Sequence, residues 1–330
     1  MLSVLENLER VDAAMPWFFP VWVFLLGACV GSFLNVCIYR IPYAQSVVRP
    51  GSHCGCGAPI RWFDNIPVLS WLLLLGRARC CGRRFSVRYP VIELLTAALF
   101  AGSWLMHSPG VAIAGMVFLS LLIGAAFIDL DHMIIPDGFS MGGSVAGVVL
   151  SFLVPALHLA EWQQVGWFPV DSLRSGLHGI SGALIGSGLL LWIGLLAEKM
   201  LRREAMGFGD VKLMGAIGAF CGWQGAIFAI FGGAVFGCVL YAIGLIWRGI
   251  FGNRTNGEGA SGEAPEAGEA GAKVDGTTSR PAAFDGEAEA APGEIPFGPS
   301  LAIGAALYFV WAHGWVDPYF RMLTAELATF

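Results

Sequence analysis

Two aspartates, Asp129 and Asp210, border long apolar runs, where an ionisable side chain is costly to place. Asp129 directly follows the apolar run that ends in Ala126–Ile128, and Asp210 follows Gly207-Phe208-Gly209. Two neighbouring carboxylates in a desolvated site do not both ionise easily. One can then act as general base on a water while the other, protonated, polarises a carbonyl, as in aspartic proteases. The sequence therefore predicts an acid–base pair for peptide hydrolysis.

Other carboxylates near this pair have structural explanations. Asp131 stands about 200° further round a helix than Asp129, so the two cannot share a face. Asp137 begins the next apolar run and suits the N-cap position of a helix. Asp210 can also be explained as the cap of the helix that follows it, and from its own surroundings this alternative stays open.

The residues around Asp210 are expected to support the catalytic site. Gly207 and Gly209 permit a tight turn and a close approach of the backbone before the carboxylate. Lys212, two residues beyond it, interrupts an otherwise apolar run. We therefore expect these three residues to be supporting parts of the catalytic site.

Four cysteines lie together in a polar, arginine-rich segment: Cys54, Cys56, Cys80 and Cys81. In a reducing compartment such a set favours a metal site over disulfides. Structural zinc takes four thiolates tetrahedrally and can fold a segment too small to have a good hydrophobic core. His53 is a further possible ligand. We predict a structural zinc site, with free thiols and then a disulfide as the alternatives.

The composition is that of a membrane protein. Of the 330 residues, 56% are hydrophobic and 13% are charged, with a mean hydropathy of +0.68, whereas soluble domains have about 25% charged residues. Several apolar runs reach the roughly 20 residues that a membrane-spanning helix needs. The sequence predicts an all-α polytopic membrane protein with about eight transmembrane helices, over residues 17–38, 90–107, 110–129, 138–157, 177–198, 209–223, 225–247 and 297–315.

Basic residues set the expected orientation, because they favour the cytoplasmic side of a membrane. Many arginines, from Arg40 to Arg88, lie between the first two expected spans, and others follow the fifth and seventh spans. Alternating crossings place these segments on one side, so we expect the cysteine segment and both aspartates at the cytoplasmic face. Both termini are then expected on the periplasmic or external side.

The expected organisation has five parts. They are an N-terminal segment with the first helix (1–40), a small cytoplasmic cysteine insert (41–89), a transmembrane catalytic core (90–251), a cytoplasmic loop (252–295), and the last helix with its tail (296–330). The loop is rich in Gly, Ala, Glu and Pro and lacks large apolar side chains, so we expect it to be disordered. Within the core, Gly182 and Gly186 have the GxxxG spacing that lets helix backbones pack closely.

Several motifs resemble those of the bacterial prepilin peptidase (type IV leader peptidase) family of GxGD-type membrane aspartyl proteases. The resemblance covers nearly the whole chain except 252–295 and the ends. The motifs, in order, are Gly31-Ser32-Phe33-Leu34-Asn35-Val36, Trp62-Phe63-Asp64-Asn65-Ile66-Pro67, Ser70-Trp71-Leu72, Arg88-Tyr89-Pro90, Glu93-Leu94-Leu95-Thr96-Ala97, Gly207-Phe208-Gly209-Asp210 and Ile295-Pro296-Phe297-Gly298-Pro299.

The resemblance implies a function and its site residues. The family's catalytic aspartates match Asp129 and Asp210. The implied activity is cleavage of prepilins and pseudopilins after a glycine, at the cytoplasmic face of the bacterial inner membrane. In many members N-methylation of the new N-terminus with S-adenosylmethionine follows. The implied partners are these substrates and the lipid bilayer, and no nucleic acid is expected.

The cysteine segment departs from the family pattern, which has two C-x-x-C pairs. On the flanking motifs, Cys56 and Cys81 match the inner positions, while the outer positions fall near His53 and on Ala78. This departure puts the zinc ligand set in doubt.

The motifs also single out Asp64, Asn65 and Glu93. Asp64-Asn65 suits a turn and Glu93 suits the first turn of a helix, and contact with substrate or methyl donor is the alternative.

Three other functions are alternatives to the bifunctional enzyme. One is a peptidase without methyltransferase activity. Another is a proton-coupled transporter, although its carboxylates should lie near the membrane midplane, and no inverted repeat is visible. The third is a scaffold subunit that binds partners through the cysteine segment.

Overall fold

The computed structural model describes residues 11, 14–160, 163–202, 206–251 and 296–327. In these ranges the regular secondary structure is helical, and the only β-structure is two isolated bridges in the largely irregular segment between α2 and α4. The all-α prediction is confirmed. The chain divides into two units, Met1–Gly237 with Pro296–Phe330, and Cys238–Ile295. The expected disordered loop, 252–295, lies outside the described residues.

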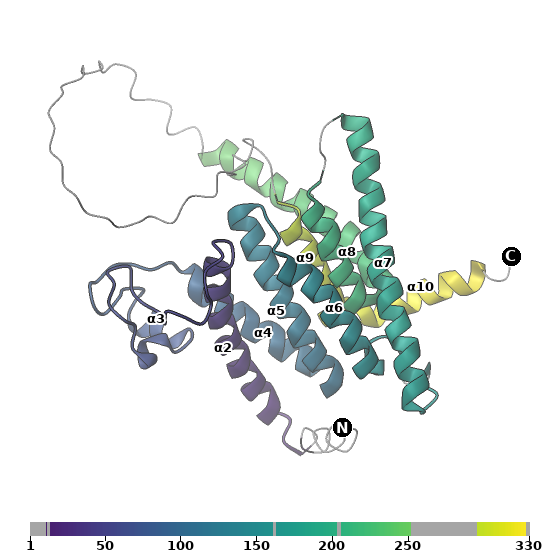
Figure 1. Cartoon of the computed structure of the whole chain (residues 1–330), viewed down its shortest axis with the longest axis horizontal. Helices are drawn as coiled ribbons and strands as arrows, with labels where there is room; N and C mark the ends of the chain where they lie inside the picture. The colour runs from purple at the N-terminus through teal and green to yellow at the C-terminus, as the bar shows by residue number, and fades with distance from the viewer. Residues whose placement is uncertain (1–10, 12–13, 161–162, 203–205, 252–295, 328–330) are drawn as a thin grey trace. The chain divides into compact units, whose positions relative to one another are not determined.

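Five helices are long and apolar enough to cross a membrane: α2 (Phe18–Arg40), α4 (Arg88–Met106), α5 (Pro109–His132), α7 (Phe168–Leu201) and the stretch Phe208–Val239 of α8 (Phe208–Phe251). The chain is therefore a multi-pass membrane protein. Figure 1 shows α2, α4, α5, α6 and α7 running beside one another.

The remaining expected spans fall on other helical segments. These are α6 (Asp137–Leu153), the second half of α8, and α9 (Gly298–Leu307) continued by a π-helical turn (Tyr308–Ala312) and α10 (His313–Leu327).

Helix α8 contains two expected spans, separated by a break at Gly222. This residue has φ 67° and ψ −177°, a conformation that glycine adopts far more readily than other residues. A Cβ atom placed on Gly186 of α7 would lie 2.8 Å from the Met214 carbonyl oxygen and 3.0 Å from Ala226 Cβ. These two contacts lie on either side of the break, so both arms of α8 pack against α7.

Close backbone packing joins α7 to α8. A Cβ atom on Gly182 would collide with the Gly218 carbonyl oxygen, and one on Gly218 would collide with the Gly182 carbonyl oxygen. With no hydrophobic force between helices in lipid, such small-residue contacts provide the van der Waals packing. The packing role predicted for Gly182 and Gly186 is confirmed.

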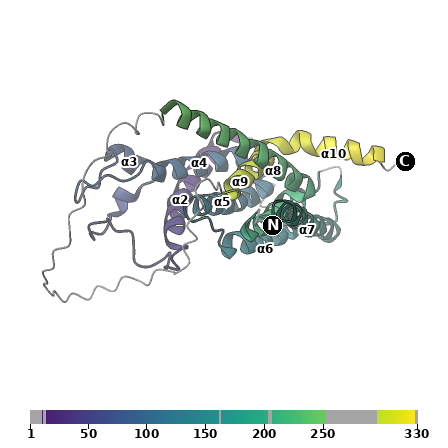
Figure 2. The same ribbon diagram turned by 90° about the horizontal axis from the view of Figure 1, so that it is seen from above.

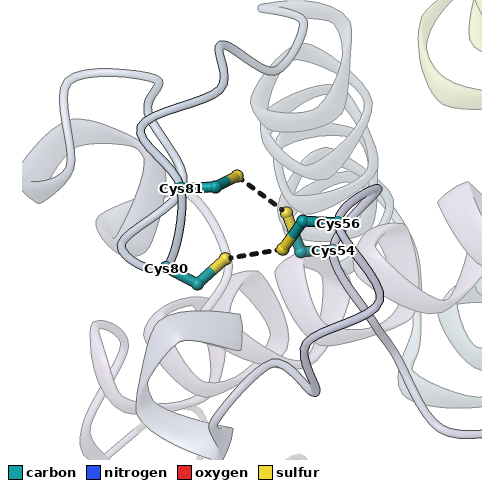
Figure 3. Close-up of side chains that lie close together, drawn as sticks. All are labelled: Cys54, Cys56, Cys80 and Cys81. Carbon is teal, nitrogen blue, oxygen red and sulfur yellow. Dashed lines mark hydrogen bonds between the residues drawn. The ribbon is translucent and has the colours of Figure 1, made fainter.

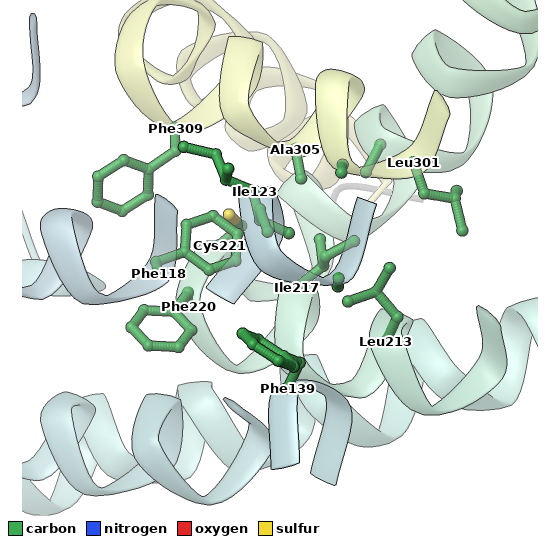
Figure 4. Packing of buried hydrophobic residues seen from close by; sticks show 14 of the residues in the cluster. Phe118, Ile123, Phe139, Leu213, Ile217, Phe220, Cys221, Leu301, Ala305 and Phe309 are labelled. Carbon is green, nitrogen blue, oxygen red and sulfur yellow. The ribbon is translucent and has the colours of Figure 1, made fainter. Parts of the chain in front are cut away.

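Helix α5 is the central helix of the first unit, since it contacts α2, α4, α6 and α9. Its Phe118 stacks on Phe220 of α8 with ring centroids 4.6 Å apart, and Phe309 packs against the Phe118 ring. Figure 4 shows this cluster of rings and aliphatic side chains. In the view turned by 90°, α9 lies beside α5 (Figure 2). The packing fixes the ends of α5, α8 and α9, which carry the candidate site.

Candidate active site

Asp129 lies in the last turn of α5 and is only 6% exposed. The helix ends at Met133, whose left-handed φ of 52° lets its N–H donate to the Asp129 carbonyl oxygen at 2.9 Å. Asp131 points elsewhere and pairs with Arg88 of α4, with Nη1 to Oδ1 at 2.7 Å. The prediction that Asp129 and Asp131 occupy different faces is confirmed.

Asp210 lies in the first turn of α8 and is 8% exposed. Its backbone N–H donates to the Gly207 carbonyl oxygen at 3.1 Å. The carboxylates of Asp210 and Asp129 are close enough to repel each other electrostatically. Among the described residues the Asp210 carboxylate caps no backbone N–H, so the capping explanation gains no support. The two aspartates are thus buried neighbours from different helices.

A third element completes this end of the bundle. Gly298, the first residue of α9, lies against Asp129, and its backbone N–H interacts with the carboxylate. Ile135 packs beside both Gly298 and Gly209. Within the described part of the chain, the buried Asp129 Oδ2 has no hydrogen-bond partner. Sequence reasoning gave Gly298 and Ile135 no role, although Gly298 stood in a quoted motif.

The two glycines before Asp210 differ in their surroundings. A Cβ atom on Gly209 would lie 3.3 Å from Ile135 Cβ, which is a tight contact. One on Gly207 would lie 3.9 Å from Asp210 Oδ2, an ordinary contact distance. Neither glycine has a left-handed φ. Close approach therefore explains a glycine at position 209 better than backbone freedom does.

Lys212 points away from the aspartate pair. Its Nζ lies 2.7 Å from Asp137 Oδ1 and 5.4 Å from the centre of the Phe208 ring. The ion pair joins α8 to the first turn of α6. Lys212 thus fixes the helix ends around the site and makes no contact with either carboxylate.

The four cysteines of the insert converge, although they come from two separate loops. Their sulfur atoms all lie within 4.8 Å of one another, with Cys54 to Cys81 at 3.6 Å and Cys56 to Cys80 at 3.4 Å (Figure 3). Four thiolates on one zinc have sulfur–zinc distances of about 2.3 Å, hence sulfur–sulfur distances of about 3.8 Å in a tetrahedron. The cluster fits such an ion. The His53 ring instead lies 3.1 Å from the Gly51 carbonyl oxygen.

Hydrogen bonds shift the pKa values of the Cys54 and Cys80 thiols in opposite directions. The backbone N–H of Cys56, with help from the other three thiols, lowers the pKa of the Cys54 thiol to about 7. The Cys80 thiol faces Cys56 and then Cys54, and these contacts raise its pKa to about 12. Crowding of sulfurs thus disfavours several thiolates at once, and a bound cation would remove this penalty.

Asp64 is held inside the insert by Arg79. The guanidinium donates to both carboxylate oxygens, from Nε at 3.0 and 3.1 Å and from Nη2 at 2.9 Å. The guanidinium also lies 5.8 Å from the centre of the Phe63 ring. Asn65, the next motif residue, is exposed. Asp64 therefore ties the two cysteine loops together.

Glu93 anchors the insert to the helices. Its buried carboxylate accepts the N–H of Val68 at 2.7 Å and a hydrogen bond from the Ser32 hydroxyl. Val68 has φ 60° and ψ −50°, and the Leu69 N–H reaches the Pro67 carbonyl oxygen at 2.5 Å. This is a γ-turn with positive φ, a strained conformation, above all for a β-branched residue. Glu93 holds that strained turn in place.

A cavity of about 700 Å³ lies at the opposite end of the bundle from the aspartates. Its walls come from the α4–α5 turn, the α6–α7 connection, the Gly222 break and α10, and they include His107, His158 and Asp317. Neither Asp129 nor Asp210 lines it. The aspartates therefore do not belong to this cavity.

Comparison with known proteins agrees with the motifs. The bacterial peptidase A24 N-terminal domain matches residues 25–107, and the type IV leader peptidase family matches residues 116–243. The chain is 37% identical over 255 residues to the prepilin leader peptidase/N-methyltransferase of Myxococcus xanthus, covering 75% of this chain and 70% of that protein. It is 36% identical over 233 residues to the protein of the same name from Klebsiella pneumoniae, covering 68% and 94%. No solved structure matches it. The chain belongs to the type IV leader peptidase family.

Proposed function

We propose that the protein is a membrane aspartyl endopeptidase that removes the leader peptide of type IV prepilins or pseudopilins, with Asp129 and Asp210 as its catalytic pair. The observation that carries this proposal is the meeting of two buried carboxylates from the end of α5 and the start of α8. Leader peptidase relatives at 36–37% identity support the substrate class. A transporter fits less well, because both carboxylates lie at helix ends.

The geometry suits hydrolysis by a shared water. One aspartate, ionised, removes a proton from water, whose oxygen attacks the carbonyl carbon of the leader's last glycine. The protonated partner donates a hydrogen bond to the carbonyl oxygen as it gains charge. Collapse of the tetrahedral intermediate breaks the C–N bond, and the departing amine takes up a proton. The products are a leader ending in a carboxylate and a pilin with a new N-terminus.

A second activity, N-methylation, rests on the names of the relatives. The new N-terminal amine would accept a methyl group from S-adenosylmethionine, forming an N–C bond as the donor's S–C bond breaks and releasing a proton. Asp64 and Glu93 are engaged by Arg79 and Val68, so they support the shape of the insert. Asn65, which is exposed, is the motif residue available for contact with substrate or methyl donor.

We assign a structural zinc ion to the cysteine cluster. Cys54, Cys56, Cys80 and Cys81 would be its ligands, and the convergence of their sulfurs supports the site. When bound, the ion would neutralise the thiolates and join two loops that have little hydrophobic core. The His53 ring, turned to Gly51, is a less suitable ligand.

The arginine distribution supports a location of the aspartate pair and the cysteine insert at the cytoplasmic face of a bacterial inner membrane, with both termini outside. The leader of a substrate would then reach the aspartates from the cytoplasm, while the apolar helix of the pilin stays in the bilayer.

The decisive experiment is co-expression of the Asp129→Asn and Asp210→Asn variants with a prepilin. Each change keeps the size of the side chain and removes its ability to exchange a proton, so processing should fall at least about a thousandfold. Cleavage is measured by the mobility shift of the pilin, and correct insertion by extraction of the enzyme with the membrane fraction. An Asp131→Asn variant is the matched control. Processing at the wild-type rate by either of the first two variants would exclude that residue from catalysis.

A further inference from the structure

The start of α9 is packed unusually tightly against Asp129. A Cβ atom built on Gly298 would lie 2.5 Å from Asp129 Oδ2, 3.2 Å from Asp129 Cγ and 3.1 Å from Ile135 Cδ1. No side chain fits there without displacing the carboxylate, because Asp129 is itself enclosed. Gly298 thus marks a place where the backbone must approach an ionisable group.

The backbone N–H of Gly298 is a hydrogen-bond donor at the start of α9. Gly298 and Pro299 are the first two residues of α9, and proline has no N–H. The Leu301 N–H is already bonded to the Phe297 carbonyl oxygen at 3.1 Å. Within the described residues the Gly298 N–H therefore has no helical partner, and it interacts with the Asp129 carboxylate. A donor at a helix N-terminus suits a negatively charged oxygen.

One oxygen of the same carboxylate has no hydrogen-bond partner among the described residues. Asp129 Oδ2 is buried and accepts no hydrogen bond within the described residues, although the residue is only 6% exposed. Buried carboxylate oxygens are normally satisfied, so an unpaired one indicates a place for a water or a substrate group. The Gly298 Cα atom lies beside this oxygen, where even a methyl group would fill the space.

We propose that Gly298 is a positioning residue of the proteolytic centre, which seats Asp129 through its backbone and keeps Oδ2 open to the reacting water. This rests on the proposed function of the Asp129–Asp210 pair. Gly298 itself touches no reacting atom and acts through Asp129. The start of α9 is then part of the catalytic centre, although about half the chain length separates it from Asp129 in sequence.

The test is steady-state cleavage of a purified prepilin by the Gly298→Ala enzyme in detergent. Loss of a pre-organised contact that acts only on the reacting groups lowers kcat by about 100-fold or more. The KM for prepilin should stay within about twofold, because the change acts on the reacting groups and not on substrate binding. Methylation of a pilin that has already been cleaved should proceed at the wild-type rate, which reports an intact fold.

Two matched glycines serve as controls. A Cβ atom on Gly304, six residues further along the same helix, would also be crowded, at 2.9 Å from the Ala229 carbonyl oxygen, but neither aspartate is among its three nearest atoms. A Cβ atom on Gly314 would meet no other atom within 4 Å. We expect Gly304→Ala to lower thermal stability with kcat of the folded enzyme nearly unchanged, and Gly314→Ala to behave as wild type.

The outcomes separate the proposals. A Gly298→Ala enzyme with wild-type kcat, or one that loses methylation and cleavage to the same degree, overturns the positioning role while leaving the aspartate pair intact. Activity of Asp129→Asn would instead overturn the pair. If Gly298→Ala does not accumulate in membranes, the same assay is applied to Gly298→Ala with Ile135→Val, which removes the methyl group nearest the added Cβ.

Discussion

The aspartate centre and the cysteine cluster are built in opposite ways. The aspartates come from α5 and α8, with Gly298 of α9 beside them, and the group is enclosed by helices distant in sequence. The cysteine pairs are 24 and 27 residues apart, lie in neighbouring loops, and are mostly exposed. Each carboxylate has few partners, whereas each thiol faces another thiol.

This difference shows where each site obtains its organisation. The aspartate centre depends on the packing of the whole bundle, which holds two like charges together at a cost. The cysteine cluster needs only its own loops, and a metal ion would provide the favourable energy. Changes in the cluster should therefore act locally, while changes in the bundle should reach the aspartates.

Among changes to the insert, the largest effect is expected from removing the metal ligands. The Cys56→Ser, Cys81→Ser double variant should lose its zinc, falling from about one ion per chain to below about a tenth, because two of four thiolates are absent. Metal content is measured on purified protein by mass spectrometry. Cleavage should persist, since α5, α8 and α9 are untouched. A Cys29→Ser, Cys37→Ser variant is the control. Loss of cleavage in proportion to zinc would contradict the separation of the two sites.

A smaller effect is expected where the insert is anchored to the bundle. Glu93→Ala leaves the buried Val68 N–H without an acceptor, at a cost of about 1–3 kcal/mol. The insert should detach more often, so trypsin should cleave at its arginines about tenfold faster. Glu93→Gln keeps an acceptor oxygen, so trypsin should cleave it at a rate between those of Glu93→Ala and the wild type. Equal protease resistance in all three proteins would show that this anchor is unimportant.

The smallest effect is expected inside the insert itself. Asp64→Asn removes the charge that Arg79 pairs with, but the Arg79 side chain is 57% exposed and solvent weakens the pair. Zinc content should be unchanged and the unfolding temperature of the insert only slightly lower. Arg84→Gln, a change at another exposed arginine of the insert, is the control. Complete loss of zinc in Asp64→Asn would instead make this pair essential to the cluster.

The membrane fold was largely predictable, because apolar run length alone locates helices. The runs predicted the ends of α2, α4 and α5 to within three residues, whereas α7, expected over 177–198, runs from Phe168 to Leu201. The polar Asp171 and Arg174 hid this extension, since hydropathy cannot tell a helix that projects beyond the apolar region from a loop. The sequence also did not predict that two of the expected spans form the single helix α8. The two parts are separated only by a break at one glycine, with no charged residues between them.

The candidate site was only partly predictable. Asp129 and Asp210 could be found from their cost at membrane depth, and Asp131 excluded from helix geometry. Their approach could not be derived, since it depends on how α5 and α8 pack. Gly298 belongs to one of the sequence motifs, but its role follows only from the packing of the first turn of α9 against Asp129. The partners of Glu93 and Lys212 are likewise tertiary contacts with no local pattern.

The break at Gly222 makes the first arm of α8 short. From Phe208 to the break the arm has roughly 14 residues, and at 1.5 Å per residue it is about 21 Å long. The hydrocarbon layer of a bilayer is about 30 Å thick. An arm of this length does not cross the layer, so when one of its ends lies at a membrane surface the other lies within the hydrocarbon region, and the bilayer thins locally around it. We expect this thinning to bring water towards the Asp210 end of the arm, where hydrolysis requires it.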